Sequence, residues 1–238
     1  MTCNHSITTS TGNNSNKKRK LLKSLGTKIN QKITEYHQFF RTPPKGEHFE
    51  DLVSQCFLEM DNSSHGWFDG DHTAGTDIWD SPLGNLSLKT NKLYGKNVIR
   101  TDISSYRLTT FGDKIAEMLD YIDSKDSDYY LLCTRRTDRG MEYEEAKKRG
   151  DGYEEYEIFL IPSNFVSVHE YEWKPCGAGW KAEVSPGFTL LIIRSMSNQF
   201  WIKGIPYDKV KPYSFQKVRI NHTQIPYKLM EVCDDMEL

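Results

Sequence analysis

The stretch GTDIWDSPLGNLSLKT, residues 75–90, predicts a β-hairpin. Apolar and polar residues alternate on both sides of SPLGN, which carries the proline and glycine typical of turns. Successive side chains on a strand point to opposite faces, so Leu86 and Leu88 would face the core and Ser87 and Lys89 the other side. The turn would fold residues 76–79 back along residues 85–90, and Asp77 would come close to Lys89.

A carboxylate, a main-chain carbonyl and an ammonium would then meet at one point. Mg²⁺ takes oxygen ligands, so the Asp77 carboxylate and the Leu88 carbonyl could bind it. Lys89 could hold or deprotonate an attacking water, or bond a phosphate oxygen. This arrangement suits metal-dependent hydrolysis of a phosphodiester. In the alternative interpretation, Asp77 only caps a turn, while Ser87 and Lys89 form a solvated strand face.

An aspartate followed about ten residues later by an acid-or-substitute–x–Lys triplet on a hairpin resembles the PD-(D/E)xK nucleases, whose largest group is the type II restriction endonucleases. Upstream, GEHFEDLV resembles the first helix of that family, with Glu50 as its acidic residue. The motifs cover about residues 46–90, and the order of helices and strands matches to about residue 135. Residues 140–238 carry no signature of the family.

The resemblance implies a Mg²⁺-dependent DNA endonuclease that acts as a homodimer, so that both strands are cut. The implied catalytic residues are Asp77, Ser87, Lys89 and Glu50. The implied metal ligands are Asp77, Leu88 and Glu50.

Ser87 departs from the pattern, because the family usually has Asp or Glu there. The substitution removes one negative charge from the metal site, so a second carboxylate must come from elsewhere. Glu50 is the first candidate, followed by Asp80 and Asp71. A rival hypothesis is a catalytically inactive nucleic-acid-binding or assembly protein with a nuclease-like fold, in which Ser87 is a trace of decay. A third is a structural protein with no nucleic-acid role.

Local basic patches would have to bind DNA, because the formal net charge is −2. Residues 89–107 are locally basic, and arginines follow the apolar run YYLLC. The predicted DNA-binding residues are Lys92, Lys96, Arg100, Arg107, Arg135, Arg136 and Arg139. Near the N-terminus, KKRK at residues 17–20 could contact phosphates, act as a nuclear-import signal, or form the solvated end of a helix.

The 238 residues are enough for one large domain. We expect a disordered polar tail over residues 1–16 and a single nuclease-like domain over residues 17–238. Its core would span about residues 45–170, and a β-rich elaboration about residues 171–228. The predicted fold class is mixed α/β (α+β), with a restriction-endonuclease-like mixed sheet flanked by helices.

Apolar residues spaced by three or four predict helices from residue 17 to 40, near residues 47–60 and over residues 109–124. Further strands are expected at residues 67–68, 96–101, 128–137 and 156–168. Ser197–Asn198 is a candidate turn between two strands, Thr189–Arg194 and Gln199–Lys203.

No run of about 18 apolar residues occurs, which predicts no membrane span. The five cysteines are scattered without a CxxC pair, so neither a zinc site nor a disulfide framework is expected. We therefore expect a reducing, cytoplasmic location.

Overall fold

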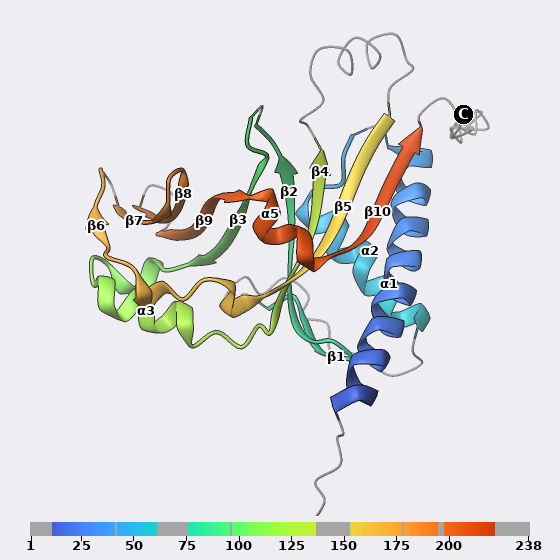
Figure 1. Cartoon of the computed structure of the whole chain (residues 1–238), viewed down its shortest axis with the longest axis horizontal. Helices are drawn as coiled ribbons and strands as arrows, with labels where there is room; N and C mark the ends of the chain where they lie inside the picture. The colour runs from blue at the N-terminus through green and yellow to red at the C-terminus, as the bar shows by residue number, and fades with distance from the viewer. Residues whose placement is uncertain are drawn as a thin grey trace, which may run out of the picture.

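A computed structural model of the chain describes residues 11–40, 42–60, 76–95, 97–136, 153–177, 179–194 and 198–221. Within them, the strands form two five-stranded sheets. Sheet A has the strand order β1-β2-β4-β5-β10, and sheet B has the order β3-β9-β8-β7-β6 (Figure 1). The mixed α/β class predicted from the sequence is confirmed.

Sheet A carries the hairpin and is mixed. Its strands are β1 (Ile78–Ser81), β2 (Gly84–Leu93), β4 (Tyr129–Arg136), β5 (Tyr153–Pro162) and β10 (Ser214–Asn221). β2 and β4 run parallel, and every other neighbouring pair is antiparallel. Parallel strands need a long crossover, which the chain makes through β3 and α3.

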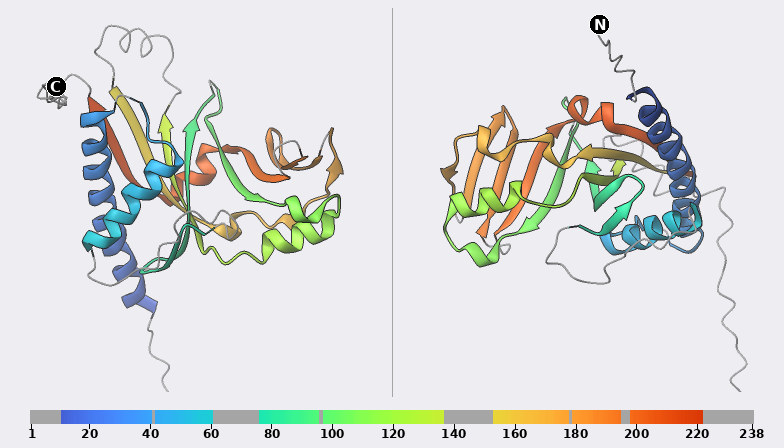
Figure 2. Two further views of the ribbon diagram at one scale, coloured as in Figure 1. Left: turned by 180° about the vertical axis from the view of Figure 1, so that it is seen from behind. Right: turned by 90° about the horizontal axis from the view of Figure 1, so that it is seen from below.

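Two helices, α1 (Thr11–Phe39) and α2 (Gly46–Met60), cover one face of sheet A (Figures 1 and 2). Leu25, Ile29 and Ile33 recur every four residues along α1 and are fully buried. They pack with Leu86 and Leu88 of β2 in the first hydrophobic core. This apolar face packs α1 against β10 and α2, and α2 in turn packs on β2 of the hairpin.

The second hydrophobic core covers the other face of sheet A, where Leu132 and Phe159 pack together with residues of sheet B such as Leu190 and Phe200. α3 (Ile115–Asp123) joins this core and lies along sheet B (Figure 2). The strands of sheet B are β3 (Arg100–Arg107), β6 (Lys174–Pro175), β7 (Gly179–Ser185), β8 (Phe188–Ile193) and β9 (Gln199–Pro206). The short helices are η1 (Thr109–Phe111), η2 (Ser163–Phe165), η3 (Val168–Glu170), α5 (Tyr207–Val210) and η5 (Lys211–Tyr213).

Strands that follow one another in the sequence do not always belong to the same sheet. β3 lies between β2 and β4 in sequence but pairs with β9 in sheet B. β10 comes from the C-terminal region, in which only an elaboration was expected, and pairs with β5 in sheet A. The β1–β2 hairpin therefore shares its sheet with β10, the last strand that the structure describes.

Most predicted elements are present, but several differ in their bounds. The strand expected over residues 156–168 is β5, which ends at Pro162 and is followed by η2 and η3. The helix expected over residues 109–124 is divided into η1 and α3, because Gly112 between them has a positive φ of 57°. α1 begins at Thr11, inside the segment for which a disordered tail was expected. The strand expected at 96–101 begins only at Arg100, because Tyr94 and Arg100 close a turn there by bonding each other's backbone. The strand expected at residues 67–68 lies outside the described residues.

The antiparallel pairing of β8 with β9 confirms the two strands expected around Ser197–Asn198. Cys56, Cys133 and Cys176 are free thiols. No helix among the described residues is both long and apolar enough to span a bilayer.

Candidate active site

The β1–β2 hairpin turns at Pro82–Leu83 and pairs Ile78 with Leu86. Asn85 anchors it: its side-chain amide donates to the Asp126 carbonyl at 3.0 Å, and its backbone N–H donates to the Asp128 carboxylate at 2.8 Å. The hairpin is therefore tied to the segment that leads into β4, and the position of Asp77 against β2 is fixed.

Three groups donate hydrogen bonds to one oxygen of Asp77. Its Oδ2 accepts hydrogen bonds from Leu88 N at 2.5 Å, from Ser87 Oγ at 3.3 Å and from Lys89 Nζ at 3.3 Å. Lys89 Nζ also donates to the Leu88 carbonyl at 2.9 Å. The predicted approach of Asp77 to Lys89 is confirmed.

The convergence occurs because β1 is shorter than β2. β1 begins at Ile78, so no strand residue lies opposite Leu88 to take its backbone hydrogen bonds. The N–H and C=O of one residue in an antiparallel strand point to the same side. The Leu88 N–H donates to the Asp77 carboxylate, and the Leu88 carbonyl accepts a hydrogen bond from the Lys89 ammonium. Two side chains therefore make the hydrogen bonds that a neighbouring strand would otherwise make.

Asp77 and Lys89 are reachable from solvent, since their side chains are 26% and 19% exposed. Ser87 is fully buried, which contradicts the interpretation of residues 87 and 89 as a solvated strand face. The reason lies in the second core: Ser87 is in register with Tyr130 of β4, and Tyr130 belongs to that core.

The second carboxylate that the site would need is not among the contacts of Asp77. Glu50 is half-buried on α2, and its Oε1 lies 3.8 Å from the position that a Cβ would take at Gly46. Its side chain therefore folds back toward the start of the helix. Asp80 is exposed near the turn end of β1, and Asp71 lies outside the described residues. Within the described part of the chain, no three His, Cys, Asp or Glu side chains gather into a group that could hold a metal.

Lys92 and Arg135 are brought together by the parallel register of β2 and β4. With Lys45, which precedes α2, they line a cavity of about 400 Å³. Arg135 Nη1 also lies 3.7 Å from Oε1 of Glu154, a buried carboxylate on β5. Lys45 was not among the predicted DNA-binding residues. The sequence offers one indication of it: Lys45 directly follows two prolines and directly precedes an amphipathic helix.

Arg100 makes hydrogen bonds within the protein that its position in a basic stretch did not predict. Its guanidinium donates to the carbonyls of Gly187 at 2.8 Å, Gly204 at 2.9 Å and Pro186 at 3.4 Å. It thereby fastens β3 to the β7–β8 turn and to β9, which leaves it few donors for DNA.

The remaining basic candidates are scattered. Arg107 is exposed at the end of β3. Arg136 lies 6.0 Å from the centroid of the Tyr207 ring. Lys96 and Arg139 lie outside the described residues.

Comparisons with protein-family models, with curated proteins and with solved structures find no match for this chain. Its function has therefore to be inferred from the hairpin and the side chains around it.

Proposed function

We propose that the chain is a Mg²⁺-dependent DNA endonuclease that hydrolyses phosphodiester bonds, similar to type II restriction enzymes. The observation that supports it is the position of the Lys89 ammonium, which lies 3.3 Å from Asp77 Oδ2 and 2.9 Å from the Leu88 carbonyl oxygen. Asp77 and Lys89 are twelve residues apart and meet at a solvent-reachable edge of the sheet.

The donors at this point fit a hard cation. A carboxylate oxygen and a main-chain carbonyl are the ligands that Mg²⁺ prefers, and both contact the positive charge of Lys89. Asp77 and Leu88 would hold the ion, with Glu50 as the candidate for a further carboxylate. When bound, Mg²⁺ would supply charge that stabilises the transition state and would lower the pKa of a water.

The chain's own residues position the reactants. The Leu88 N–H and the Ser87 hydroxyl fix the Asp77 carboxylate, so little reorganisation is needed during the reaction. Lys89 would orient the attacking water or donate to a non-bridging phosphate oxygen. The water oxygen bonds to phosphorus and gives up a proton to solvent, the bond from phosphorus to the sugar oxygen breaks, and the departing oxygen takes up a proton from solvent.

The Lys45–Lys92–Arg135 cavity would bind a flanking phosphate. Lys92 follows Lys89 by three residues on β2, a distance of roughly 10 Å at the rise of a strand. A homodimer would place two such edges on opposite strands of a duplex, so that both strands are cut.

A catalytically inactive nucleic-acid-binding or assembly protein is the alternative, and two observations favour it. Ser87, at the usual acid position, is buried and contributes no negative charge. Asp77 has no second carboxylate among its contacts, and the described residues contain no three-residue metal group.

Cleavage of a long DNA of mixed sequence in the presence of Mg²⁺ tests the proposal. Asp77→Asn and Lys89→Ala should each lower the cleavage rate by about 100-fold or more, because each removes a group that contacts the reacting atoms. Asp80→Asn is the matched control. Asp80 lies on the same hairpin, but the structure places it exposed at the turn end and not among the contacts of Asp77, so it is no longer a candidate ligand. Its positive φ of 51° is one that asparagine tolerates. The Asp80→Asn variant should cut at the original rate.

Calorimetric titration with Mn²⁺ gives a second readout that does not depend on cleavage. Asp77→Asn should weaken Mn²⁺ binding, and Asp80→Asn should not. If the DNA stays intact but the chain binds it in a salt-dependent manner, the inactive alternative is favoured. An unchanged cleavage rate in Lys89→Ala would contradict the proposed mechanism.

A further inference from the structure

A cavity of about 830 Å³ lies between the N-terminal half of α1, the end of α2 and the β1–β2 turn. The early part of α1 passes close to this turn in Figure 1. Lys17, Lys18 and Lys20 line one side of the cavity. Its floor is largely apolar and includes Phe57, Met60, Leu83 and Tyr129.

Among the described residues, no acidic side chain neutralises the lysines of the cavity. None of the described residues that line it is acidic, and Lys17 and Lys20 form no ion pair within the described part of the chain. Lys18 Nζ donates to the neutral Tyr129 hydroxyl at 2.7 Å and lies 4.2 Å from the centroid of that ring.

Two lysines further along α1 form ion pairs. Lys28 and Lys32 reach Glu59 of α2 at 2.7 and 2.6 Å. Within the part of the chain that the structure describes, the cations of α1 are therefore neutralised where the helix packs on α2 but not where it borders the cavity, so this cavity is complementary to an anion.

The apolar floor narrows the class of ligand. Phosphates alone could be bound on a flat lysine surface, whereas a hollow of this size with aromatic and aliphatic walls suits a flat apolar group. Sites for unpaired nucleic acid combine these two features, a basic rim for the backbone and an aromatic surface for the base.

The position of the cavity suits the same ligand. Leu83 belongs to the turn of the hairpin that carries Asp77 and Lys89. Asp77 and Pro82 are five residues apart, which is roughly 16 Å along a strand, or about five base steps. A nucleic-acid strand bound at Asp77 would therefore reach the cavity within about five nucleotides.

We infer that this cavity binds an unpaired nucleotide of a nucleic-acid strand, with the base on the apolar floor and the backbone phosphates on Lys17, Lys18 and Lys20. The inference rests on the proposed function insofar as both place nucleic acid along the hairpin. An acidic peptide is the competing occupant.

Fluorescence anisotropy of the full chain in EDTA tests the inference, because no cleavage takes place without a divalent metal. The probes are a blunt DNA duplex and the same duplex with a short single-stranded tail. The original chain should bind the tailed duplex about tenfold more tightly, as expected for one stacked base.

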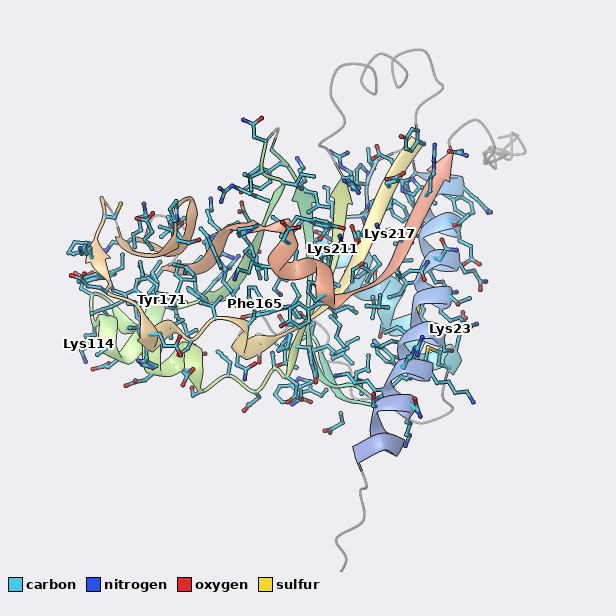
Figure 3. The ribbon with its side chains drawn as sticks, viewed as in Figure 1. Lys23, Lys114, Phe165, Tyr171, Lys211 and Lys217 are labelled. Atoms are coloured by element: carbon cyan, nitrogen blue, oxygen red, sulfur yellow. The ribbon has the colours of Figure 1, made fainter. Side chains whose placement is uncertain are left out.

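A matched pair of double variants separates local contact from general charge. Lys17→Gln/Lys20→Gln should abolish the preference for the tail and lower the slope of log K against log salt by about 1.5, for two lost phosphate contacts. Arg19→Gln/Lys23→Gln removes the same charge from exposed residues that do not line the cavity, and should keep the preference. Lys23 is labelled on α1 in Figure 3.

Equal binding of the two probes by the original chain would overturn the inference, as would equal effects of the two double variants. Polyglutamate that displaces the tail as well as a single-stranded oligonucleotide does would assign the cavity to acidic peptides instead. The chain could fail to cut DNA and still prefer the tailed duplex, with the preference lost only in Lys17→Gln/Lys20→Gln. That result would support this inference and contradict the endonuclease proposal.

Discussion

Ser87 stands where the PD-(D/E)xK pattern usually has an acid, and its surroundings suit a hydroxyl. It is fully buried and donates to Asp77 Oδ2 at 3.3 Å. A carboxylate at this position would bury a second negative charge beside the first. Without a cation, such a pair is unfavourable and one member gains a proton.

Ser87→Asp should therefore make the fold depend on a metal. We expect its melting temperature in EDTA to fall by roughly 3–6 °C, because an uncompensated polar or charged group is buried. Mn²⁺ should restore more stability to this variant than to the original chain, because a second carboxylate strengthens the site. Thermal unfolding with and without Mn²⁺ measures both effects.

Ser87→Asn is the control for this prediction, since asparagine has the shape of aspartate without its charge. It should be destabilised without gaining a response to Mn²⁺. An equal Mn²⁺ response in both variants would contradict the placement of a cation beside residue 87.

At the scale of elements, Glu59 joins α1 to α2. Hydrogen bonds from Lys28 and then from Lys32 lower the pKa of Glu59 to about 2. The pKa of a glutamate in an unfolded chain is about 4.3. Because the folded pKa is the lower one, the contribution to stability is complete above pH of about 4.3 and is lost as the pH falls toward 2.

Glu59→Gln should lower the melting temperature near pH 7 by roughly 1–3 °C, the range expected for partly exposed ion pairs. The difference from the original chain should shrink below pH of about 4 and vanish near pH 2, and melting curves at several pH values measure it. Glu117→Gln is the control, because Glu117 pairs with Lys114 within the exposed surface of α3 and links no two elements. Its effect should be smaller, and a pH-independent loss in Glu59→Gln would contradict the assignment.

At the scale of the whole molecule, β10 completes the sheet that holds the candidate active site. It pairs with β5 from Ser214 to Asn221. Val218 and Ile220 of β10 are buried in the first core, the one that contains Leu86 and Leu88 of the hairpin. The C-terminal region is therefore part of the structure that supports Asp77 and Lys89.

A chain that ends at residue 213 should lose cooperative thermal unfolding, because the first core loses one wall and β5 gains an unpaired edge. A chain that ends at residue 221 keeps β10 and should keep cooperative unfolding. Circular dichroism on heating distinguishes the two. An unchanged melting temperature for the chain that ends at residue 213 would show that the core is independent of β10.

The sequence by itself determined the features that depend on near neighbours in the chain. Apolar spacing located α1 and α2, and the SPLGN turn located the hairpin and brought Asp77 within 3.3 Å of Lys89. These contacts span at most about a dozen residues, so helical and strand periodicity and turn chemistry suffice to predict them.

Only the tertiary structure decided what each face of these elements meets. Ser87 is buried because strands far along the chain cover the second face of sheet A, and Arg100 is held by carbonyls of residues 186, 187 and 204. The lysines of α1 border a cavity because α2 and the hairpin turn close around them. Alternation along a strand shows which residues share a face, but only the fold decides whether that face meets solvent, a core or a ligand.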